Sequence, residues 1–456
     1  MKTLLIAPYF KEGLKGFPLG LAYIAGSIKD DYDVYGLDLT AKATVENKNP
    51  EKVLRDELLR IKPEIVCITS TSPTHLSAID TARIVREELG KDVLIVKGGP
   101  HETNCAPTTL KYHPEIDVLV IGEGEKTMKE ILDTVAQGKS LEKVLGIAYK
   151  QNGEIKVNPR RPLISDINSI PRPARELFYS TDELQRYYDA KIFGGRKTAT
   201  LITSRGCFYN CNYCSSRVIW GRTLRQRKVE DVLNEIEDLY TLGYKGFQFV
   251  DDNGISDKNW FLRFAEALKQ SEMDVQYAMQ TRVNSIDDKV AKALQESGCT
   301  FIYFGIESGV QEILDICGKG ITLKQAKRAF ELTRKYGIRA MASIQFGLLG
   351  EDLKNLSTVR ETIKVINEML RPDEVVISYT SLYPGSDLAN HYGITAEEYE
   401  KRINDGINKA VGKKLFHGTK AIHPPELTSN KIEEIEQLLD KELKIPRFKP
   451  TELYSE

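Results

Sequence analysis

Residues 204–216 read Ser-Arg-Gly-Cys-Phe-Tyr-Asn-Cys-Asn-Tyr-Cys-Ser-Ser, so Cys207, Cys211 and Cys214 follow one another with the spacing C-x3-C-x2-C. Three thiolates at this spacing can bind three irons of a four-iron cluster and leave the fourth iron open to another ligand. Gly206 before the first cysteine and Tyr213 before the third also favour a cluster. The stretch therefore predicts an iron–sulfur centre with one iron available for chemistry.

Two other interpretations of the cysteine triplet are less favoured. A structural zinc site needs a fourth cysteine or histidine at matching short range, whereas Cys105 and Cys299 lie far away in the sequence. Disulfide frameworks are typical of small secreted domains. This chain spreads seven cysteines over 456 residues, and we expect no secretory leader because the N-terminus reads as a buried strand.

The composition predicts a cytoplasmic enzyme. Charged residues make up 28% of the chain and hydrophobic residues 41%, and the formal net charge is −1. This balance does not indicate a nucleic-acid-binding patch. The apolar runs at residues 3–7 and 247–250 have the length of strands and fall far short of the ~20 residues that a membrane span needs. We therefore expect no nucleic-acid partner and no membrane span.

The first part of the chain, residues 1–145, alternates short apolar runs with amphipathic stretches. This alternation predicts an α/β fold, a doubly wound parallel sheet of the Rossmann or flavodoxin type with helices on both faces. The predicted strands are residues 3–7, 33–37, 65–69, 93–97 and 118–121.

Ligands of such sheets bind beyond the carboxyl ends of the strands. The loops there are rich in small residues, which let a large planar ligand and its phosphate approach the backbone closely. The candidate ligand-binding residues are Pro18, Leu19, Gly20, Ser70, Thr71, Ser72, Thr74, Gly98, Gly99, Pro100, His101, Gly122, Glu123, Gly124 and Glu125.

Residues 146–197 read as a linker, because prolines at 159, 162, 171 and 173 break regular structure. A second alternation of strands and helices follows over residues 198–390, and residues 391–456 read as a helical C-terminal region. The predicted strands of this second part are residues 199–203, 246–250, 275–279, 301–305, 339–346 and 374–379.

Six strands with intervening helices predict a partial six-unit barrel of the TIM type, whose active site would lie at the carboxyl ends of the strands. Polar residues occur at that end of successive strands. They are Asp251, Asp252, Gln280, Arg282, Glu307, Ser308 and Gln345.

With its C-x3-C-x2-C motif the chain resembles the radical S-adenosylmethionine (SAM) superfamily. The upstream α/β domain, with Gly98-Gly99-Pro100-His101 and Gly122-Glu123-Gly124-Glu125, resembles the cobalamin-binding domain of class B radical SAM methyltransferases. The resemblance covers about residues 1–390. It implies a 4Fe-4S cluster on Cys207, Cys211 and Cys214, SAM on the open iron, and cobalamin on the N-terminal loops.

The resemblance also implies roles for the polar strand ends. Asp251 and Asp252 stand where the family places the acceptor of the SAM amine. Arg282 can pair with the SAM carboxylate, and Glu307 can accept from ribose hydroxyls. Tyr213, Gln280, Ser308 and Gln345 complete the candidate SAM site.

One departure concerns the cobalt. The cobalamin domain of methionine synthase has an Asp-x-His-x-x-Gly motif after its first strand, and this histidine binds cobalt. Here the loop reads Ala7-Pro8-Tyr9-Phe10-Lys11-Glu12-Gly13 and has no histidine. His75 and His101 lie on candidate cobalamin loops, but we predict neither as a cobalt ligand, because an isolated loop histidine more often forms hydrogen bonds.

The function implied is methylation of an unactivated carbon of a small molecule or a peptide or protein side chain, with methylcobalamin and a 5′-deoxyadenosyl radical. The alternative keeps both cofactors but catalyses cyclisation, ring rearrangement or oxidation. A non-catalytic cobalamin or redox sensor is less favoured. A methylthiotransferase is disfavoured because those proteins carry three further cysteines upstream, whereas this chain has only Cys67 and Cys105 there. An electron donor such as flavodoxin or ferredoxin is the expected partner.

Overall fold

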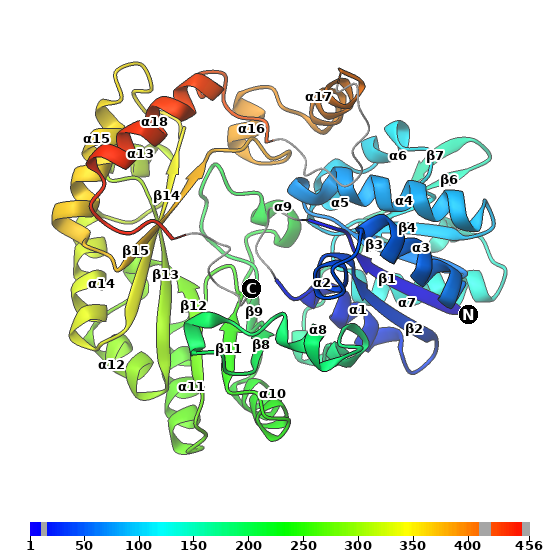
Figure 1. Cartoon of the computed structure of the whole chain (residues 1–456), viewed down its shortest axis with the longest axis horizontal. Helices are drawn as coiled ribbons and strands as arrows, with labels where there is room; N and C mark the ends of the chain where they lie inside the picture. The colour runs from blue at the N-terminus through cyan, green and yellow to red at the C-terminus, as the bar shows by residue number, and fades with distance from the viewer. Residues whose placement is uncertain (11–15, 410–420, 449–456) are drawn as a thin grey trace. The chain divides into compact units, whose positions relative to one another are not determined.

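The chain divides into two compact units in the computed structural model, which describes residues 1–10, 16–409 and 421–448. Unit 1 comprises Met1–Tyr188 and Gly393–Ala421, and unit 2 comprises Asp189–Tyr392 and Ile422–Glu456 (Figure 1). Residues 11–13 of the first predicted loop lie outside the described residues. The same holds for residues 410–420 and 449–456 of the predicted C-terminal region.

Unit 1 contains a seven-stranded sheet in the order β2-β1-β3-β4-β5-β6-β7. The first five strands are parallel, and β6 and β7 pair antiparallel at one edge. This order matches the flavodoxin-like arrangement, so the predicted parallel sheet is confirmed. The strands are β1 (Lys2–Ala7), β2 (Asp33–Asp38), β3 (Ile65–Thr69), β4 (Leu94–Gly98), β5 (Val118–Val120), β6 (Ile147–Gln151) and β7 (Glu154–Val157).

Helices cover both faces of this sheet, with α3 and α4 packed together on one face and α1 and α7 on the other (Figure 1). Helix α3 begins at Pro50 because the side chain of Asn49 accepts hydrogen bonds from two backbone N–H groups of its first turn. The helices are α1 (Leu19–Ile28), α2 (Leu39–Val45), α3 (Pro50–Ile61), α4 (His75–Leu89), α5 (Pro100–Cys105), α6 (Thr108–Tyr112), α7 (Gly124–Ala136), α8 (Asp182–Arg186) and α17 (Ala396–Lys409).

The segment 146–197, predicted as a linker, begins with a β-hairpin that belongs to the sheet of unit 1. Asn152 and Gly153 connect β6 to β7, and both have positive φ, 53° and 81°. A two-residue Asn-Gly turn of this kind has the twist that joins antiparallel strands. Further along, the backbone N–H of Ala174 donates to the carbonyl of Ala22 on α1 at 2.8 Å. Much of this segment therefore packs against unit 1.

Unit 2 contains a six-stranded, all-parallel sheet in the order β15-β14-β13-β12-β11-β8. The predicted strands 339–346 and 374–379 coincide with β14 and β15. The strands are β8 (Thr198–Leu201), β11 (Gly246–Phe249), β12 (Gln276–Thr281), β13 (Cys299–Glu307), β14 (Arg339–Phe346) and β15 (Glu374–Tyr379), and β9 (Ser204–Arg205) pairs separately with β10 (Arg225–Gln226).

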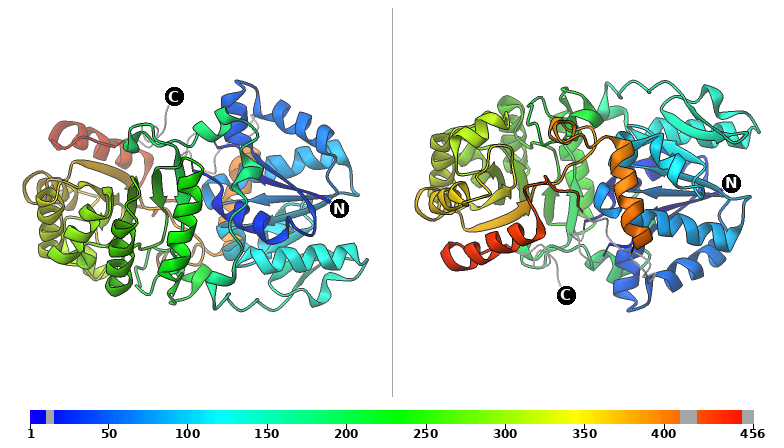
Figure 2. Two further views of the ribbon diagram at one scale, coloured as in Figure 1. Left: turned by 90° about the horizontal axis from the view of Figure 1, so that it is seen from below. Right: turned by 90° about the horizontal axis from the view of Figure 1, so that it is seen from above.

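Helices α10, α11, α12, α14 and α15 line the outer face of this curved sheet, and α18 packs against α15 (Figure 2). Apolar side chains of strands and helices form the core between these layers. The helices are α9 (Ser216–Trp220), α10 (Val229–Thr241), α11 (Lys258–Gln270), α12 (Asp288–Glu296), α13 (Gln311–Ile316), α14 (Leu323–Lys335), α15 (Ser357–Lys364), α16 (Asp387–His391) and α18 (Ser429–Glu442).

Of the helices that the structure describes, none is both long enough and apolar enough to cross a membrane.

Candidate active site

The three cysteines of the predicted cluster site lie in the loop between β9 and α9, and all three are partly exposed free thiols. Gly206 opens this loop with φ +93°, and a Cβ atom there would stand 2.1 Å from the carbonyl oxygen of Thr223. The backbone N–H of Asn212 donates to the carbonyl of Cys317 at 2.9 Å. Backbone contacts thus help to hold the loop, and none of its three thiols is in a disulfide.

The thiol groups suit an iron–sulfur cluster. Burial raises the pKa of Cys207, and the neighbouring Asp252 and Cys211 add to this rise. Burial likewise raises the pKa of Cys214 to about 11, with Cys211 contributing. The thiolate is the form that binds metal. A positively charged centre would offset the cost of gathering three thiolates, so the chemistry of this set fits the cluster.

Two aspartates follow β11 and contact the start of the cysteine loop. Asp251 is buried, and its Oδ1 accepts from the backbone N–H and the hydroxyl of both Thr203 and Ser204, at 2.5 to 3.0 Å. Its other oxygen, Oδ2, has no hydrogen-bond partner among the residues that the structure describes. Asp252 accepts from the backbone N–H of Gly206 at 3.2 Å and from the hydroxyl of Ser216 at 2.8 Å. Burial raises the pKa of both carboxyl groups.

The end of β12 contributes a glutamine and an arginine. The side-chain amide of Gln280 donates to the carbonyl of Asp251 at 2.5 Å. Arg282 is buried, and its guanidinium lies over the ring of Tyr209 at 3.6 Å from the centroid. It also donates to the Sγ of Cys211 at 3.7 Å and to the carbonyl of Lys319. Its Nε has no hydrogen-bond partner. The structure therefore places Arg282 directly beside the cysteine loop.

The end of β13 carries a buried ion pair. Glu307 Oε1 accepts from Lys319 Nζ at 2.7 Å, and the same Nζ lies 3.2 Å from the hydroxyl of Tyr213. Glu307 has φ +71°, a left-handed conformation that is uncommon for a residue other than glycine. Lys319 thus connects Glu307 with Tyr213 of the cysteine motif, and sequence reasoning did not select it.

The remaining predicted strand-end residues have local partners. Ser308 is buried, and its hydroxyl accepts from the backbone N–H of Val310 at 3.2 Å. The amide of Gln345 on β14 donates to the hydroxyl of Thr380 at 3.0 Å. Glu351, in the loop after β14, was not selected from the sequence. Burial raises its pKa to about 7, and its Oε1 has no hydrogen-bond partner.

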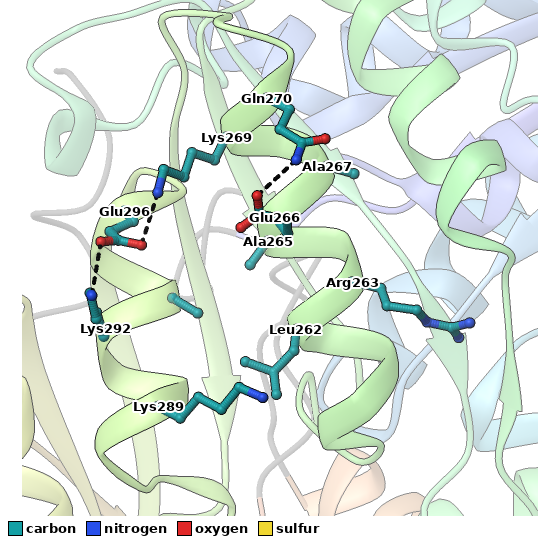
Figure 3. A pocket seen from close by; sticks show the side chains of 11 residues that line it. Leu262, Arg263, Ala265, Glu266, Ala267, Lys269, Gln270, Lys289, Lys292 and Glu296 are labelled. Atoms are coloured by element: carbon teal, nitrogen blue, oxygen red, sulfur yellow. Dashed lines mark hydrogen bonds and ion pairs between the residues drawn. The ribbon is translucent and has the colours of Figure 1, made fainter.

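A surface groove of about 530 Å³ lies elsewhere in unit 2, between α11 and α12 (Figure 3). Glu296 accepts from Lys269 at 3.1 Å and lies 3.6 Å from Lys292, and Gln270 donates to Glu266 at 2.8 Å. These helices cover the outer face of the sheet, whereas the cysteines follow the carboxyl end of β8. The groove is a charged, solvent-facing hollow, and it contains none of the candidate site residues.

In unit 1, the predicted glycines lie at the starts of helices and after strands. Gly99 precedes α5 with φ +109°, and a Cβ atom there would stand 2.5 Å from the carbonyl oxygen of Ser70, so the backbones of these loops touch. At Gly20 and Gly122 a Cβ atom would meet nothing within 4 Å. Open space over glycine backbone at this edge fits a large ligand such as a corrin ring.

The other predicted residues of unit 1 form contacts within the unit. Pro18, Leu19 and Gly20 begin α1, and Gly98 ends β4 before Gly99 and Pro100. Thr71 and Thr74 form a capping box. Glu123 accepts from the backbone N–H of Ile164 at 2.6 Å, and Gly124 and Glu125 begin α7.

Three of the predicted residues, Ser70, Ser72 and His101, are buried in a polar cluster. The hydroxyl of Ser70 donates to Glu102 at 3.1 Å. The hydroxyl of Ser72 lies 3.1 Å from Nδ1 of His101, whose Nε2 lies 3.1 Å from Glu400. The sequence did not indicate Glu400, because almost 300 residues separate it from its partners.

Known protein families match both parts of this chain. Residues 201–364 match the radical SAM superfamily, and residues 11–132 match the B12 binding domain. The chain is 35% identical to an uncharacterized methyltransferase of Pyrococcus horikoshii, over 85% of this chain and 82% of that protein. It is 30% identical to the anaerobic magnesium-protoporphyrin IX monomethyl ester cyclase of Rubrivivax gelatinosus, over 88% of this chain and 71% of the cyclase.

The fold is also found in a solved structure. The radical SAM methyltransferase TsrM of Kitasatospora setae, with cobalamin and a [4Fe-4S] cluster bound, superimposes with a TM-score of 0.73. The match covers 98% of this chain and 93% of TsrM at 17% identity, so it confirms the predicted fold class. The predicted cofactors are confirmed by the two matched families: a 4Fe-4S cluster, SAM and cobalamin. The protein is an enzyme, and it belongs to the cobalamin-dependent (class B) radical SAM methyltransferase family.

Proposed function

We propose that this enzyme methylates an unactivated carbon of a small molecule or of a peptide or protein side chain. The observation that carries the proposal is the 35% identity to a methyltransferase along 85% of the chain, together with a cysteine loop whose thiols are not used in the fold. When bound, the cluster with SAM supplies a 5′-deoxyadenosyl radical, and cobalamin carries the methyl group.

In this proposal the residues of unit 2 hold and orient SAM. Cys207, Cys211 and Cys214 bind the cluster. The unpartnered Oδ2 of Asp251 and the carboxylate of Asp252 accept from the SAM ammonium. Arg282 pairs with the SAM carboxylate, because its fork already lies beside Cys211.

Further residues of unit 2 complete the SAM site. Glu307 accepts from ribose hydroxyls while it forms its buried ion pair with Lys319. Gln280, Ser308 and Gln345 supply polar groups at the ends of neighbouring strands, and Tyr213 packs beside Lys319.

The loops of unit 1 bind cobalamin in this proposal. Gly20 and Gly122 leave open backbone, and Gly99 allows the β4 loop to lie against Ser70. The hydroxyls and backbone N–H groups of Thr71 and Thr74 lie on the same edge of the sheet. The remaining candidates of this set are Pro18, Leu19, Ser72, Gly98, Pro100, His101, Glu123, Gly124 and Glu125.

A second candidate function keeps both cofactors and forms a ring or another rearranged product without methyl transfer. The specific observation in its favour is the 30% identity to an anaerobic cyclase along 88% of the chain. The two functions differ in the fate of SAM, because methylation converts one SAM to S-adenosylhomocysteine and another to 5′-deoxyadenosine.

The products of SAM therefore test the proposal. The anaerobic protein would be reconstituted with iron, sulfide and hydroxocobalamin, reduced, and incubated with methyl-deuterated SAM and a cell extract. We expect S-adenosylhomocysteine, 5′-deoxyadenosine and an extract component that carries the deuterated methyl group. Formation of 5′-deoxyadenosine alone, without label transfer, would contradict methylation and support the second function.

Two cysteine variants are matched controls for this assay. Cys211→Ala removes a cluster ligand and should abolish both products, because the electron that cleaves SAM comes from the cluster. Cys299→Ala removes a buried thiol on β13 and should keep both products. We further propose a cytoplasmic location and a flavodoxin or ferredoxin as the electron donor.

A further inference from the structure

A cluster of buried ionisable side chains lies in unit 1, and of its members only His101 is among the candidate cobalamin residues. His75, His101 and Glu400 are fully buried, and His113 is 4% exposed. Lys97 and Glu102 lie in the same cluster, form an ion pair, and are also fully buried. Charged side chains are almost never buried without partners that compensate their charge. The charges of these buried groups must therefore be compensated by their neighbours.

The imidazole rings of His75, His101 and His113 all direct Nε2 toward the carboxylate of Glu400. Nε2 of His75 and Nε2 of His113 each lie 3.3 Å from Oε2 of Glu400. Nε2 of His101 lies 3.1 Å from Oε1, which also accepts from the hydroxyl of Thr109 at 3.0 Å. The ligand atoms of His75, His113 and Glu400 all lie within 4.8 Å of one another.

The opposite ring nitrogens face other groups. Nδ1 of His75 lies 3.7 Å from Oε1 of Glu102, which can accept from it, and 3.1 Å from Lys97 Nζ. Nδ1 of His101 lies 3.1 Å from the hydroxyl of Ser72. Nδ1 of His113 lies 4.0 Å from Glu115. Histidines that bind a metal commonly use one nitrogen for the metal and hold the other through an outer partner.

Hydrogen bonding alone leaves this cluster incomplete. Nε2 of His75 is buried and has no hydrogen-bond partner, although an oxygen of Glu400 lies 3.3 Å away. Lys97 and Glu102 compensate each other. Within the part of the chain that the structure describes, the carboxylate of Glu400 lies within ion-pair or hydrogen-bond distance of the three imidazoles and Thr109. Lys97 lies close enough for its charge to interact with that of Glu400, but its ammonium pairs directly with Glu102.

We propose that His75, His113 and Glu400 bind one zinc ion. Two imidazoles and a carboxylate are a known ligand set of zinc, with bonds of about 2.0–2.1 Å. Ligand atoms on a tetrahedron with such bonds stand ~3.3 Å apart. The two distances of 3.3 Å to Glu400 match this edge. The ion would place a positive charge directly against the buried carboxylate, and a water molecule would complete its coordination.

The proposed ion would fix the C-terminal segment to the N-terminal sheet. Glu400 lies on α17, which packs against α5 and α6, whereas His75 begins α4 and His113 follows α6. The zinc site thus joins Glu400 to histidines that lie 287 and 325 positions before it. Its role is structural, because it holds the returning segment 393–409 within unit 1.

Metal analysis of the complete enzyme tests the proposal. The anaerobic protein, loaded with cluster and cobalamin so that its cysteines are occupied, would be incubated with excess zinc and then dialysed. We expect about one zinc per chain in addition to iron and cobalt, and X-ray absorption at the zinc edge should show nitrogen and oxygen ligands at about 2.0–2.1 Å without sulfur. Less than about a fifth of this zinc content, or sulfur ligands, would overturn the proposal.

Variants of one helix provide the control. Glu400→Gln keeps the shape of the side chain but removes its charge, and it should lose the zinc while it retains iron and cobalt. Glu397→Gln changes an exposed residue of α17 that pairs with Lys111 at 2.6 Å, and it should keep the zinc. Equal zinc content in both variants would contradict the site. If Glu400→Gln does not fold, the zinc content and absorption spectrum of the unchanged protein decide the question.

Discussion

Both units leave some buried polar atoms without a hydrogen-bond partner among the described residues, but the two units arrange these atoms differently. In unit 2, the strand ends near the cysteines retain unpartnered atoms, among them Oδ2 of Asp251, Nε of Arg282 and Oε1 of Glu351. In unit 1, the histidines converge on Glu400 in a closed cluster with almost no exposure. Unpartnered polar atoms are costly in a protein interior. We infer that the first set is kept for ligands that come and go, and the second for one permanent ion.

A buried ion pair in unit 2 provides the largest expected effect on stability. Lys319→Met leaves the carboxylate of Glu307 without its cation, although the two side chains are only 7% and 11% exposed. Loss of one partner of a buried pair destabilises a protein by about 3–5 kcal/mol. Chemical denaturation under anaerobic conditions would measure this loss in the free energy of unfolding.

Two further variants show whether the unpaired charge is the cause. In Lys319→Met combined with Glu307→Gln no buried charge remains, so most of the stability should return. Lys335→Met breaks an exposed pair with Asp288, both more than half exposed, and should cause no measurable change. If the double variant is as unstable as Lys319→Met, packing of the lysine side chain and not its charge explains the loss. Glu307 would then belong with the groups of unit 2 that we infer are kept for ligands.

The same contrast explains what the sequence could predict. The cysteine triplet spans residues 207–214, so its chemistry is visible as a spacing. The polar strand ends were found because parallel strands bring their carboxyl ends to one edge of a sheet. Lys319 escaped notice because it follows α13, not a strand, although its neighbours Gly318 and Gly320 both have φ +64°. The histidine cluster had no sequence signal, because only the return of α17 brings Glu400 to His75.

The proposed contact of Arg282 with SAM gives the next effect. Arg282→Lys keeps the positive charge but removes the fork that contacts Tyr209, Cys211 and the carbonyl of Lys319. We expect the KM for SAM to rise about 10- to 100-fold, the equivalent of one or two hydrogen bonds to a charged group. The formation of 5′-deoxyadenosine at varied SAM concentrations measures it.

Arg263→Lys is the matched control, because Arg263 lines the outer groove between α11 and α12 (Figure 3). Its KM for SAM should equal that of the unchanged enzyme. An unchanged KM in Arg282→Lys would mean that Arg282 only supports the cysteine loop. The groups of unit 2 that we infer are kept for ligands would then lose their main cation.

The smallest expected effect depends on pH and concerns Glu351. Burial raises its pKa from the ordinary value of 4.5 to about 7, so the folded protein holds a proton that the unfolded chain has released in this range. Stability from this group is therefore complete below pH 4.5 and is lost as the pH rises through 7. Glu351→Gln cannot ionise, and its side-chain oxygen can still accept from the backbone N–H of Gly347.

We compare the free energy of unfolding of Glu351→Gln with that of the unchanged protein. The difference should be about 1–2 kcal/mol more in favour of the variant at pH 8 than at pH 5. It is no larger because partial exposure of the side chain offsets part of the cost of burying the charge. Thermal unfolding of both proteins at the two pH values measures the difference. If the stability of both proteins changes with pH in the same way, Glu351 ionises at its ordinary pKa. Its Oε1 then has water as a hydrogen-bond partner. The contrast between the two units would then rest on Asp251 and Arg282, whose side chains contact the cysteine loop or the residues just before it.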